Sequence, residues 1–498
     1  MSQFLYRVVF VGALLAAWPV MAALDEEDLP GYGEWRSGGF FVGLTEPESR
    51  VWFNDKRIVV DEDGYFLLGF DREMQGEQRL IISLPDGTER EYSPKVESRN
   101  YQVQRIDGLQ QGFVTPPPSA MERIRREAEA VGNARLTSIE SNHWRAPFIW
   151  PVQGRITGVY GSQRILNEVP GAPHWGIDIA APQGSPVLAP AGGEVVLAED
   201  DLYYSGGTLI ISHGAGLSSS FLHLSRIDVA VGDRVKQGQV VAAVGSTGRS
   251  TGPHLDWRIN IGEVRTDAAL WVPRLEDLCE PKGEGTEAVV LLHGLGRTDR
   301  SMERLASTLA EEGYVTCNQS YPSRSESLQE LAGYAANAVE KLRQQGYERV
   351  HLVTHSMGGI LARYWLQWGQ LPDDSAVVML SPPNHGSEII DTLGDQPWFQ
   401  WVFGPAAMEL STQENALVNR IGPINERVGI ITGVRSSDPW FNFLFDDAHD
   451  GKVTVSSAQL SEAEGFRVVE SGHTFIMNDE KVRSLVVEFL RDGYFSSD

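Results

Sequence analysis

Residues 350–359 read VHLVTHSMGG, and this stretch decides the fold of the C-terminal half of the chain. It predicts an apolar strand, then a sharp turn with Ser356 at its apex, then an apolar helix over 360–368. A turn of this kind lifts the serine hydroxyl out at the carboxyl edge of a sheet. We expect Gly358 where the strand and the helix approach closely. Thr354 replaces the first glycine that is usual in this motif, and its side chain is still small.

The segments around this turn alternate between strand and helix patterns. Apolar runs predict strands over 288–292 and 350–354, and helices are expected over 301–312 and 328–345. Alternating elements of this kind indicate a mostly parallel sheet with helices on both of its faces. The sequence therefore predicts an α/β domain over 286–498.

An acid and a histidine follow the serine in an order that suits nucleophilic catalysis. A serine hydroxyl is a poor nucleophile until a histidine takes its proton, and a carboxylate holds that imidazole in the correct tautomer. His473 is the expected base for Ser356. The candidate acids lie close together at Asp446, Asp447 and Asp450.

Residues 291–296 read LLHGLG and end the first strand of this domain. This loop, the serine turn and the ordered acid and base are found together in bacterial α/β-hydrolase lipases and esterases, and the C-terminal part of the chain resembles that family. The resemblance implies an ester or lipid substrate and an oxyanion hole made by the backbone N–H groups of Leu295 and Met357. It also favours Asp450, because Asp-Gly before a β-branched run is typical of the acid loop in those lipases. Three further histidines are expected to shape loops: His293, His355 and His385.

The preceding region, 147–265, has short glycine-rich β runs that predict a second all-β domain. Three of its segments carry side chains that zinc prefers: PHWGID at 173–178, FLHLS at 221–225 and GPHLDW at 252–257. His254 and Asp256 are two residues apart. On a strand they project from the same face, so they can share one site.

These three segments, in this order, resemble the lysostaphin-like (LytM-type) zinc metalloendopeptidases, which cut peptidoglycan cross-bridges. The resemblance implies that His174 and Asp178 are Zn²⁺ ligands, and that His223 and His254 activate water and stabilise the tetrahedral intermediate. The family usually has a histidine at the remaining ligand position, where this chain has Asp256.

A carboxylate at position 256 is a legitimate zinc ligand, but it changes the charge of the site. One histidine and two carboxylates leave the metal formally neutral, so its water should be less acidic. We therefore expect an active but slower or more alkaline-shifted peptidase. The alternative is a metal-free domain that binds peptidoglycan or activates another hydrolase. His213, outside the three segments, is expected in a turn.

The N-terminal part, residues 34–115, is predicted to be a β-sandwich, because short strands alternate with turn residues. It has no His or Cys, the usual metal ligands, so we expect an accessory role. A connecting segment over 116–146 follows, with a capping box at Ser119 and Glu122 that starts a helix over 121–131. Residues 266–285 are expected to link the second and third domains.

The first residues predict a cleavable signal peptide over 1–22. Arg7 precedes an apolar run over 8–20, which is shorter than a spanning helix needs. We expect export to the periplasm or beyond, with no stable membrane span after cleavage; an uncleaved anchor is the alternative. The two cysteines, Cys279 and Cys317, either pair or leave Cys317 as a packed core thiol.

The formal net charge of −25 excludes nucleic acid and anionic membrane surfaces as long-range partners. The sequence thus predicts an exported bifunctional hydrolase, in which a zinc-dependent peptidoglycan endopeptidase is joined to a serine esterase or lipase. The alternative is a cell-wall-binding or regulatory domain that positions an active esterase. The aromatic stretch over 397–405 is expected either to line an acyl pocket as a lid or to pack as ordinary core.

Overall fold

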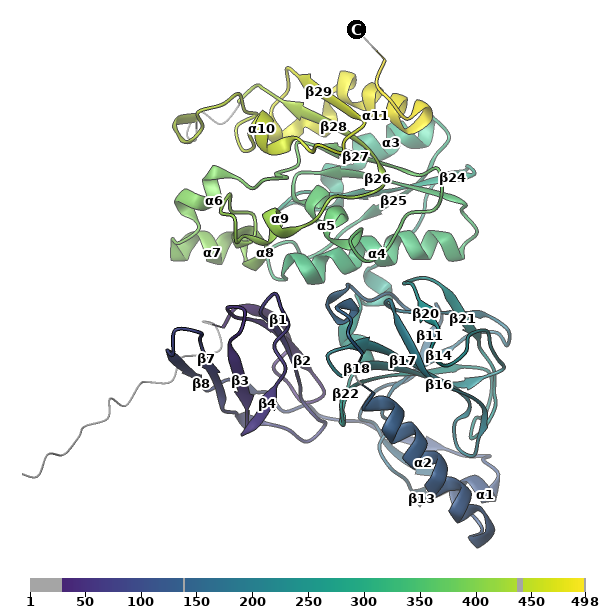
Figure 1. Cartoon of the computed structure of the whole chain (residues 1–498). Helices are drawn as coiled ribbons and strands as arrows, with labels where there is room; N and C mark the ends of the chain where they lie inside the picture. Colours follow the sequence, from purple (N-terminus) through teal and green to yellow (C-terminus); the bar gives the residue numbers. More distant parts are fainter. Residues whose placement is uncertain (1–28, 138, 437–441, 497–498) are drawn as a thin grey trace, which may run out of the picture.

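The computed structural model describes residues 29–137, 139–436 and 442–496. Figure 1 shows a purple β region, a teal region of strands beside helix α2, and a layered green-to-yellow region above both. The predicted multi-domain order of β-sandwich, all-β domain and α/β domain is confirmed. The expected signal peptide lies outside the described residues. Within the described ranges, no helix has both the length and the apolarity that crossing a membrane requires.

The N-terminal region consists of two larger antiparallel sheets and one two-stranded sheet, with an apolar core. Alternate residues such as Phe41, Val51 and Leu80 point into that core, as expected for strands with one buried face. The first sheet has the order β1 (Gly31–Gly33), β2 (Phe40–Leu44), β5 (Tyr65–Gly69). The second has the order β4 (Lys56–Ile58), β3 (Arg50–Phe53), β7 (Leu80–Ser83), β8 (Glu89–Tyr92), and β6 (Gly76–Glu77) pairs with β9 (Lys95–Val96).

The connecting segment contains β10 (Val103–Ile106), α1 (Gln111–Val114) and α2 (Met121–Arg135). The predicted capping box at its start is wrong. A short 3₁₀ turn begins at Pro118, so Ser119 lies inside the turn, and the N-cap of α2 is Ala120, without a side-chain hydrogen bond. A complete capping box starts helix α4 instead, between Ser327 and Glu330.

The central region is built on an eight-stranded antiparallel sheet in the order β11-β14-β22-β18-β17-β16-β20, with β23 paired to β22. Smaller sheets, β15-β21-β19 and β10-β12-β13, flank it, and β10 from the connecting segment runs parallel to β12. The bounds are β11 (Arg155–Gly158), β12 (Gln163–Leu166), β13 (Val169–Pro170), β14 (Ile177–Ala180), β15 (Pro186–Leu188), β16 (Gly193–Leu202), β17 (Gly206–Gly214), β18 (Leu217–Leu224), β19 (Arg226–Ile227), β20 (Arg234–Val235), β21 (Val240–Ala243), β22 (Leu255–Ile261) and β23 (Val264–Thr266).

His213 does not lie in a turn, contrary to expectation. It is fully buried in β17, where its ring nitrogens contact the carbonyl of Gly192 at 2.7 Å and the hydroxyl of Ser219 at 2.9 Å. Burial lowers its pKa to about 4. It is therefore a neutral core histidine that is held by two hydrogen bonds.

The C-terminal region has a six-stranded parallel sheet in the order β25-β24-β26-β27-β28-β29. Helices α3 and α11 pack on one face and α4 and α5 on the other, as the alternating pattern predicts. The strands are β24 (Glu287–Leu292), β25 (Val315–Gln319), β26 (Arg349–His355), β27 (Ala376–Leu380), β28 (Arg427–Gly433) and β29 (Gly465–Val469). The helices are α3 (Glu303–Glu311), α4 (Leu328–Gln344), α5 (Met357–Trp365), α6 (Glu388–Leu393), α7 (Pro397–Phe403), α8 (Pro405–Met408), α9 (Leu417–Arg420), α10 (Val455–Ala458) and α11 (Glu480–Asp492).

Buried side-chain amides join the central region to the C-terminal one. The Asn337 side chain on α4 accepts a hydrogen bond from the N–H of Trp150 and donates one to the carbonyl of Phe148, both at 2.9 Å. The Gln237 amide oxygen accepts a hydrogen bond from the Trp365 indole N–H, also at 2.9 Å. These bonds and the surrounding apolar contacts hold the two regions in one arrangement.

Cys279 and Cys317 are joined by a disulfide bond, so the pairing that the sequence left open is present. The bond connects the linker after the central region to β25, the edge strand of the parallel sheet. It therefore fixes the linker against the C-terminal domain.

Candidate active sites

The serine turn at the end of β26 has the conformation that its sequence predicts. Ser356 has a φ of +53°, which is strained for a residue with a β-carbon, and α5 begins at the next residue. A β-carbon at Gly358 would lie 2.7 Å from the carbonyl oxygen of Leu292, so the close approach expected there is confirmed. Thr354 is fully buried beneath the turn.

The structure brings Ser356, His473 and Asp450 together in one hydrogen-bonded chain. His473 Nδ1 lies 2.8 Å from the Asp450 carboxylate, and His473 Nε2 lies 3.0 Å from Ser356 Oγ. Because the carboxylate only accepts, Nδ1 carries the proton and Nε2 is free to accept one from the serine. Asp446 and Asp447, the rival acids, are exposed to solvent.

Asp450 is fully buried and is also held by the backbone. Its Oδ1 accepts hydrogen bonds from the N–H groups of Lys452 at 3.1 Å and Val453 at 2.9 Å. Burial alone would raise the pKa of Asp450, but His473 and these hydrogen bonds keep it below its ordinary value. The carboxylate is therefore ionised and fixed in orientation.

The two expected oxyanion donors are Met357, which directly follows the serine, and Leu295, which follows Gly294. Among the described residues, the N–H groups of Leu295 and Met357 have no protein acceptor, so both are free to bind a ligand. Gly294 packs against the serine so closely that a β-carbon there would lie 3.1 Å from Ser356 Cβ. His355 Nε2 lies 3.0 Å from the backbone carbonyl of His473.

The aromatic stretch forms α7, a short helix between β27 and β28. Phe399 is buried, but Trp398 is 55% and Trp401 87% exposed. The two tryptophans therefore do not pack as core, and the helix presents them to solvent on the C-terminal domain.

In the central domain, His174, Asp178 and Asp256 each place one potential ligand atom within 4.8 Å of the others. All three residues are buried. Asp178 on β14 stands directly opposite Asp256 on β22. Like charges in this position repel, so the pair needs a cationic partner.

Three atoms of this cluster have no hydrogen-bond partner: both ring nitrogens of His174 and Oδ1 of Asp178. His174 Nε2 and Asp178 Oδ1 are 3.1 Å apart, but their orientation makes no hydrogen bond between them. Buried polar atoms that stay unsatisfied in this way call for a bound group. A histidine nitrogen and a carboxylate oxygen are both donors that zinc prefers, so these residues fit a zinc ion.

Two arginines that the sequence analysis does not identify form ion pairs with the carboxylates of Asp178 and Asp256. Arg164 contacts Asp178 Oδ2 at 2.5 Å, and Arg258 binds Asp256 through two bonds of 2.9 and 2.5 Å. Burial would raise the pKa of Asp256, but Arg258 and His174 hold it well below its ordinary value. The charge count from the sequence alone, which left the metal formally neutral, therefore omits two positive charges.

His223 and His254 lie beside the cluster, with their ring centres 4.8 Å apart. The Nδ1 atoms point at backbone carbonyls, that of Thr247 for His223 and that of Gly252 for His254, both at 2.8 Å. In the neutral ring each Nδ1 must therefore be the donor, and Nε2 is then the atom with a free lone pair. His254 Nε2 lies 3.8 Å from Asp178 Oδ1. Burial lowers the pKa of His223 to about 4.

A groove with a volume of about 260 Å³ leads to this cluster. Asp178, His223 and His254 line its inner end. Part of its wall comes from the connecting segment, at Gln104 and Ile106 of β10 and at Leu109. The connecting segment therefore takes part in forming the groove.

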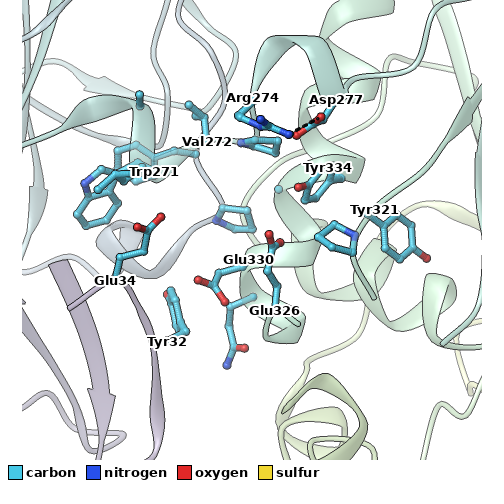
Figure 2. Close-up of a pocket in the computed structure, with 18 of the residues that line it drawn as sticks. Tyr32, Glu34, Trp271, Val272, Arg274, Asp277, Tyr321, Glu326, Glu330 and Tyr334 are labelled. Carbon is cyan, nitrogen blue, oxygen red and sulfur yellow. Dashed lines mark hydrogen bonds and ion pairs between the residues drawn. The ribbon is translucent and has the colours of Figure 1, made fainter. Parts of the chain in front are cut away.

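A larger cavity of about 810 Å³ lies where the N-terminal region, the linker and α4 meet (Figure 2). Figure 2 shows Tyr32 and Glu34 on one side, and Glu326 and Glu330 at the start of α4 on another. Burial and the neighbouring carboxylates raise the pKa of Glu326 to about 8. The lining residues are far apart in the sequence, so no local motif signals this cavity.

Comparisons with known proteins match two stretches of the chain. The model of peptidase family M23 matches residues 172–268, and that of the alpha/beta hydrolase family matches residues 289–481. The cell division protein DipM of Caulobacter vibrioides is 31% identical over 31% of this chain and 24% of its own length. The peptidoglycan DD-endopeptidase ShyB of Vibrio cholerae is 40% identical over 19% of this chain and 22% of its own length.

The chain spans about a quarter of the length of these curated relatives. A solved structure of a peptidase M23 from Pseudomonas aeruginosa is 28% identical, with a TM-score of 0.38, over 48% of this chain and 95% of its own. Both resemblances that the sequence predicts are confirmed. Residues 172–268 form a peptidase M23 domain, and residues 289–481 form an α/β-hydrolase domain.

Proposed function

We propose that the α/β-hydrolase domain is a serine ester hydrolase. The observation that supports this most is the continuous chain from Ser356 Oγ through His473 to the buried Asp450 carboxylate. In it, His473 Nε2 removes the serine proton as the hydroxyl attacks an ester carbonyl, and Asp450 stabilises the imidazolium that forms. The N–H groups of Leu295 and Met357 then bind the developing oxyanion.

We propose that the M23 domain is a zinc-dependent peptidoglycan endopeptidase. The unsatisfied atoms of His174 and Asp178, with Asp256 beside them, support a bound cation. Zinc, when bound, supplies Lewis-acid polarisation of the scissile carbonyl. The unprotonated Nε2 atoms of His223 and His254 are placed to accept the proton of the attacking water and to return one to the leaving amine.

The substrate is proposed from the relatives. ShyB of Vibrio cholerae is a peptidoglycan DD-endopeptidase and is 40% identical to this chain over 96 residues. Export to the periplasm or beyond suits such a substrate. It is supported by the apolar run over 8–20 and by the disulfide between Cys279 and Cys317, since disulfides persist in oxidising compartments.

Two assays on the full chain test the pair of activities. Purified peptidoglycan should release peptides in a zinc-dependent, chelator-sensitive reaction. A p-nitrophenyl ester should be hydrolysed in a reaction that a serine-directed inhibitor blocks and a chelator leaves intact. The two assays are independent: failure of peptide release contradicts only the endopeptidase proposal, and failure of ester hydrolysis contradicts only the esterase proposal.

The alternative for the M23 domain is a metal-free domain that binds the cell wall and positions the esterase. The ion pairs of Arg164 and Arg258 favour it, because they already neutralise both carboxylates. Zinc content decides between the two. We expect one zinc per chain after zinc loading and its loss in His174→Ala, whereas a chain that retains no zinc supports the metal-free alternative.

A further inference from the structure

Arg249 is a cation in the groove of the M23 domain for which the structure offers no counter-ion. Of the described residues that line the groove, Asp178 alone is acidic, and its Oδ2 is already paired with Arg164. Among the described residues, no carboxylate lies within ion-pair distance of Arg249; its recorded partners are a backbone carbonyl and an aromatic ring.

The position of Arg249 is fixed by neutral groups. Its guanidinium carbon lies 4.7 Å from the centre of the Tyr204 ring, and one guanidinium N–H donates to the carbonyl of Phe113 at 3.4 Å. Its own backbone N–H donates to the carbonyl of Tyr204 at 2.8 Å. These contacts orient the side chain without pairing its charge with a carboxylate of the described residues.

The surroundings of Arg249 favour an anion. Burial and the neighbouring guanidiniums of Arg164 and Arg258 lower its pKa, so a negative charge placed beside it relieves both effects. The planar fork of an arginine matches a carboxylate through two parallel hydrogen bonds. Because the groove continues to His254 and Asp178, such an anion belongs to a ligand that also reaches the catalytic cluster.

We propose that Arg249 binds a carboxylate of the peptide substrate and so makes the M23 groove selective for anionic peptides. This rests on the proposed endopeptidase function, and it names the substrate class for that site. Phe113 and Tyr204 act as positioning residues, since they hold the guanidinium rather than the ligand. The α1 segment of the connecting region thereby contributes to substrate selection.

The test compares two synthetic peptides on the full chain. One carries a free carboxylate beside its scissile amide, and the other carries a carboxamide at that place. Dissociation constants are measured by calorimetry on chelator-treated protein, so that binding is read without hydrolysis. The wild type should prefer the carboxylate by about 10-fold or more, since a hydrogen-bonded ion pair is worth at least that factor.

In Arg249→Gln the two dissociation constants should be about equal, whereas Arg249→Lys should keep part of the preference. Arg226→Gln is the matched control, because Arg226 is an exposed cation of the same domain that lies outside the groove and pairs with Asp228. It should keep the full preference. Thermal unfolding of each variant confirms that the fold is intact.

Three results would overturn the proposal: a wild type that binds both peptides equally, a wild type that binds neither, or an Arg249→Gln variant with an unchanged preference. Hydrolysis is then measured separately on zinc-loaded protein. If the preference is present and depends on Arg249 while no peptide is cut, the endopeptidase function fails and the binding role of Arg249 stands.

Discussion

The serine site and the metal site both bury carboxylates, but they neutralise them in different ways. Asp450 is held by neutral backbone N–H groups and by His473, and every member of its chain has a partner. Asp178 and Asp256 are each paired with an arginine, while Asp178 Oδ1 and the ring nitrogens of His174 stay unsatisfied. The serine site is thus complete with protein groups alone, whereas the candidate metal site is balanced in charge and still has buried polar atoms without a partner.

The largest expected effect is a loss of ester hydrolysis when the hydrogen-bonded chain of Ser356, His473 and Asp450 is disrupted. Asp450→Asn keeps the shape of the residue but favours the wrong tautomer of His473, and should reduce kcat for a p-nitrophenyl ester by about 10⁴-fold. The control is Asp447→Asn, an exposed rival acid, which should retain wild-type turnover. Full activity in Asp450→Asn would show that the hydrogen-bonded chain is not the catalytic one.

The second prediction concerns the charge balance of the metal site. Arg258→Met leaves the fully buried Asp256 carboxylate without its partner, and should lower the free energy of unfolding by about 3 kcal/mol or more in chelator-treated protein. Zinc should restore more stability to this variant than to the wild type, because a bound cation replaces the lost charge. Chemical unfolding with and without zinc measures both quantities.

The exposed Arg226→Met is the control and should change stability little. If Arg258→Met lowers the free energy of unfolding no more than this control, Arg258 does not stabilise the Asp256 carboxylate. The two sites would then not differ in the way they neutralise their carboxylates.

The third prediction concerns the cavity in Figure 2, which lies where the N-terminal region, the linker and α4 meet. Burial raises the pKa of Glu326 to about 8, so the folded chain holds this proton at pH values where the unfolded chain has released it. The contribution of this group to stability is therefore present below the unfolded pKa and is lost as the pH rises toward 8. Urea unfolding between about pH 5 and pH 8 should show this decline in the wild type and a smaller one in Glu326→Gln.

Glu284→Gln, at an exposed position of the linker, should leave the decline unchanged. Equal pH dependence in the wild type and Glu326→Gln would mean that this carboxyl is not buried in solution and that the cavity is more open.

The smallest effect is expected at α7. Trp401 is 87% exposed, so Trp401→Ala should change the free energy of unfolding by less than about 0.5 kcal/mol. Phe399→Ala, on the buried side of the same helix, should cost about 3 kcal/mol. If α7 covers an acyl pocket, Trp401→Ala should also change the ratio of rates for long-chain and short-chain esters, and an unchanged ratio would contradict the lid hypothesis.

Much of the fold could be predicted from the sequence, because its signals are local. The turn at Ser356 and the alternating strands and helices follow from the order of neighbouring residues, and the parallel sheet follows from that alternation. The capping-box pattern at Ser119 and Glu122 is not sufficient by itself, because Pro118 starts a 3₁₀ turn first. The same pattern at Ser327 and Glu330 does form the box, at the start of α4.

The candidate metal site shows what the sequence could not supply. The spacing of His254 and Asp256 predicts a shared face, but the partners depend on strand register, which places Asp178 opposite Asp256. Arg258 was within reach of prediction, since it is two residues beyond Asp256 on the same strand. Arg164 was not, because it lies on β12 in a separate sheet that only folding brings against Asp178.

The amide bridges at Asn337 and Gln237 have a consequence for the two proposed active sites. Two domains on a flexible tether would each orient independently toward a substrate. Here the orientation of one domain sets that of the other, so a chain bound through its M23 groove presents Ser356 in one fixed direction. The distance and the angle between the two sites are thus properties of the folded chain.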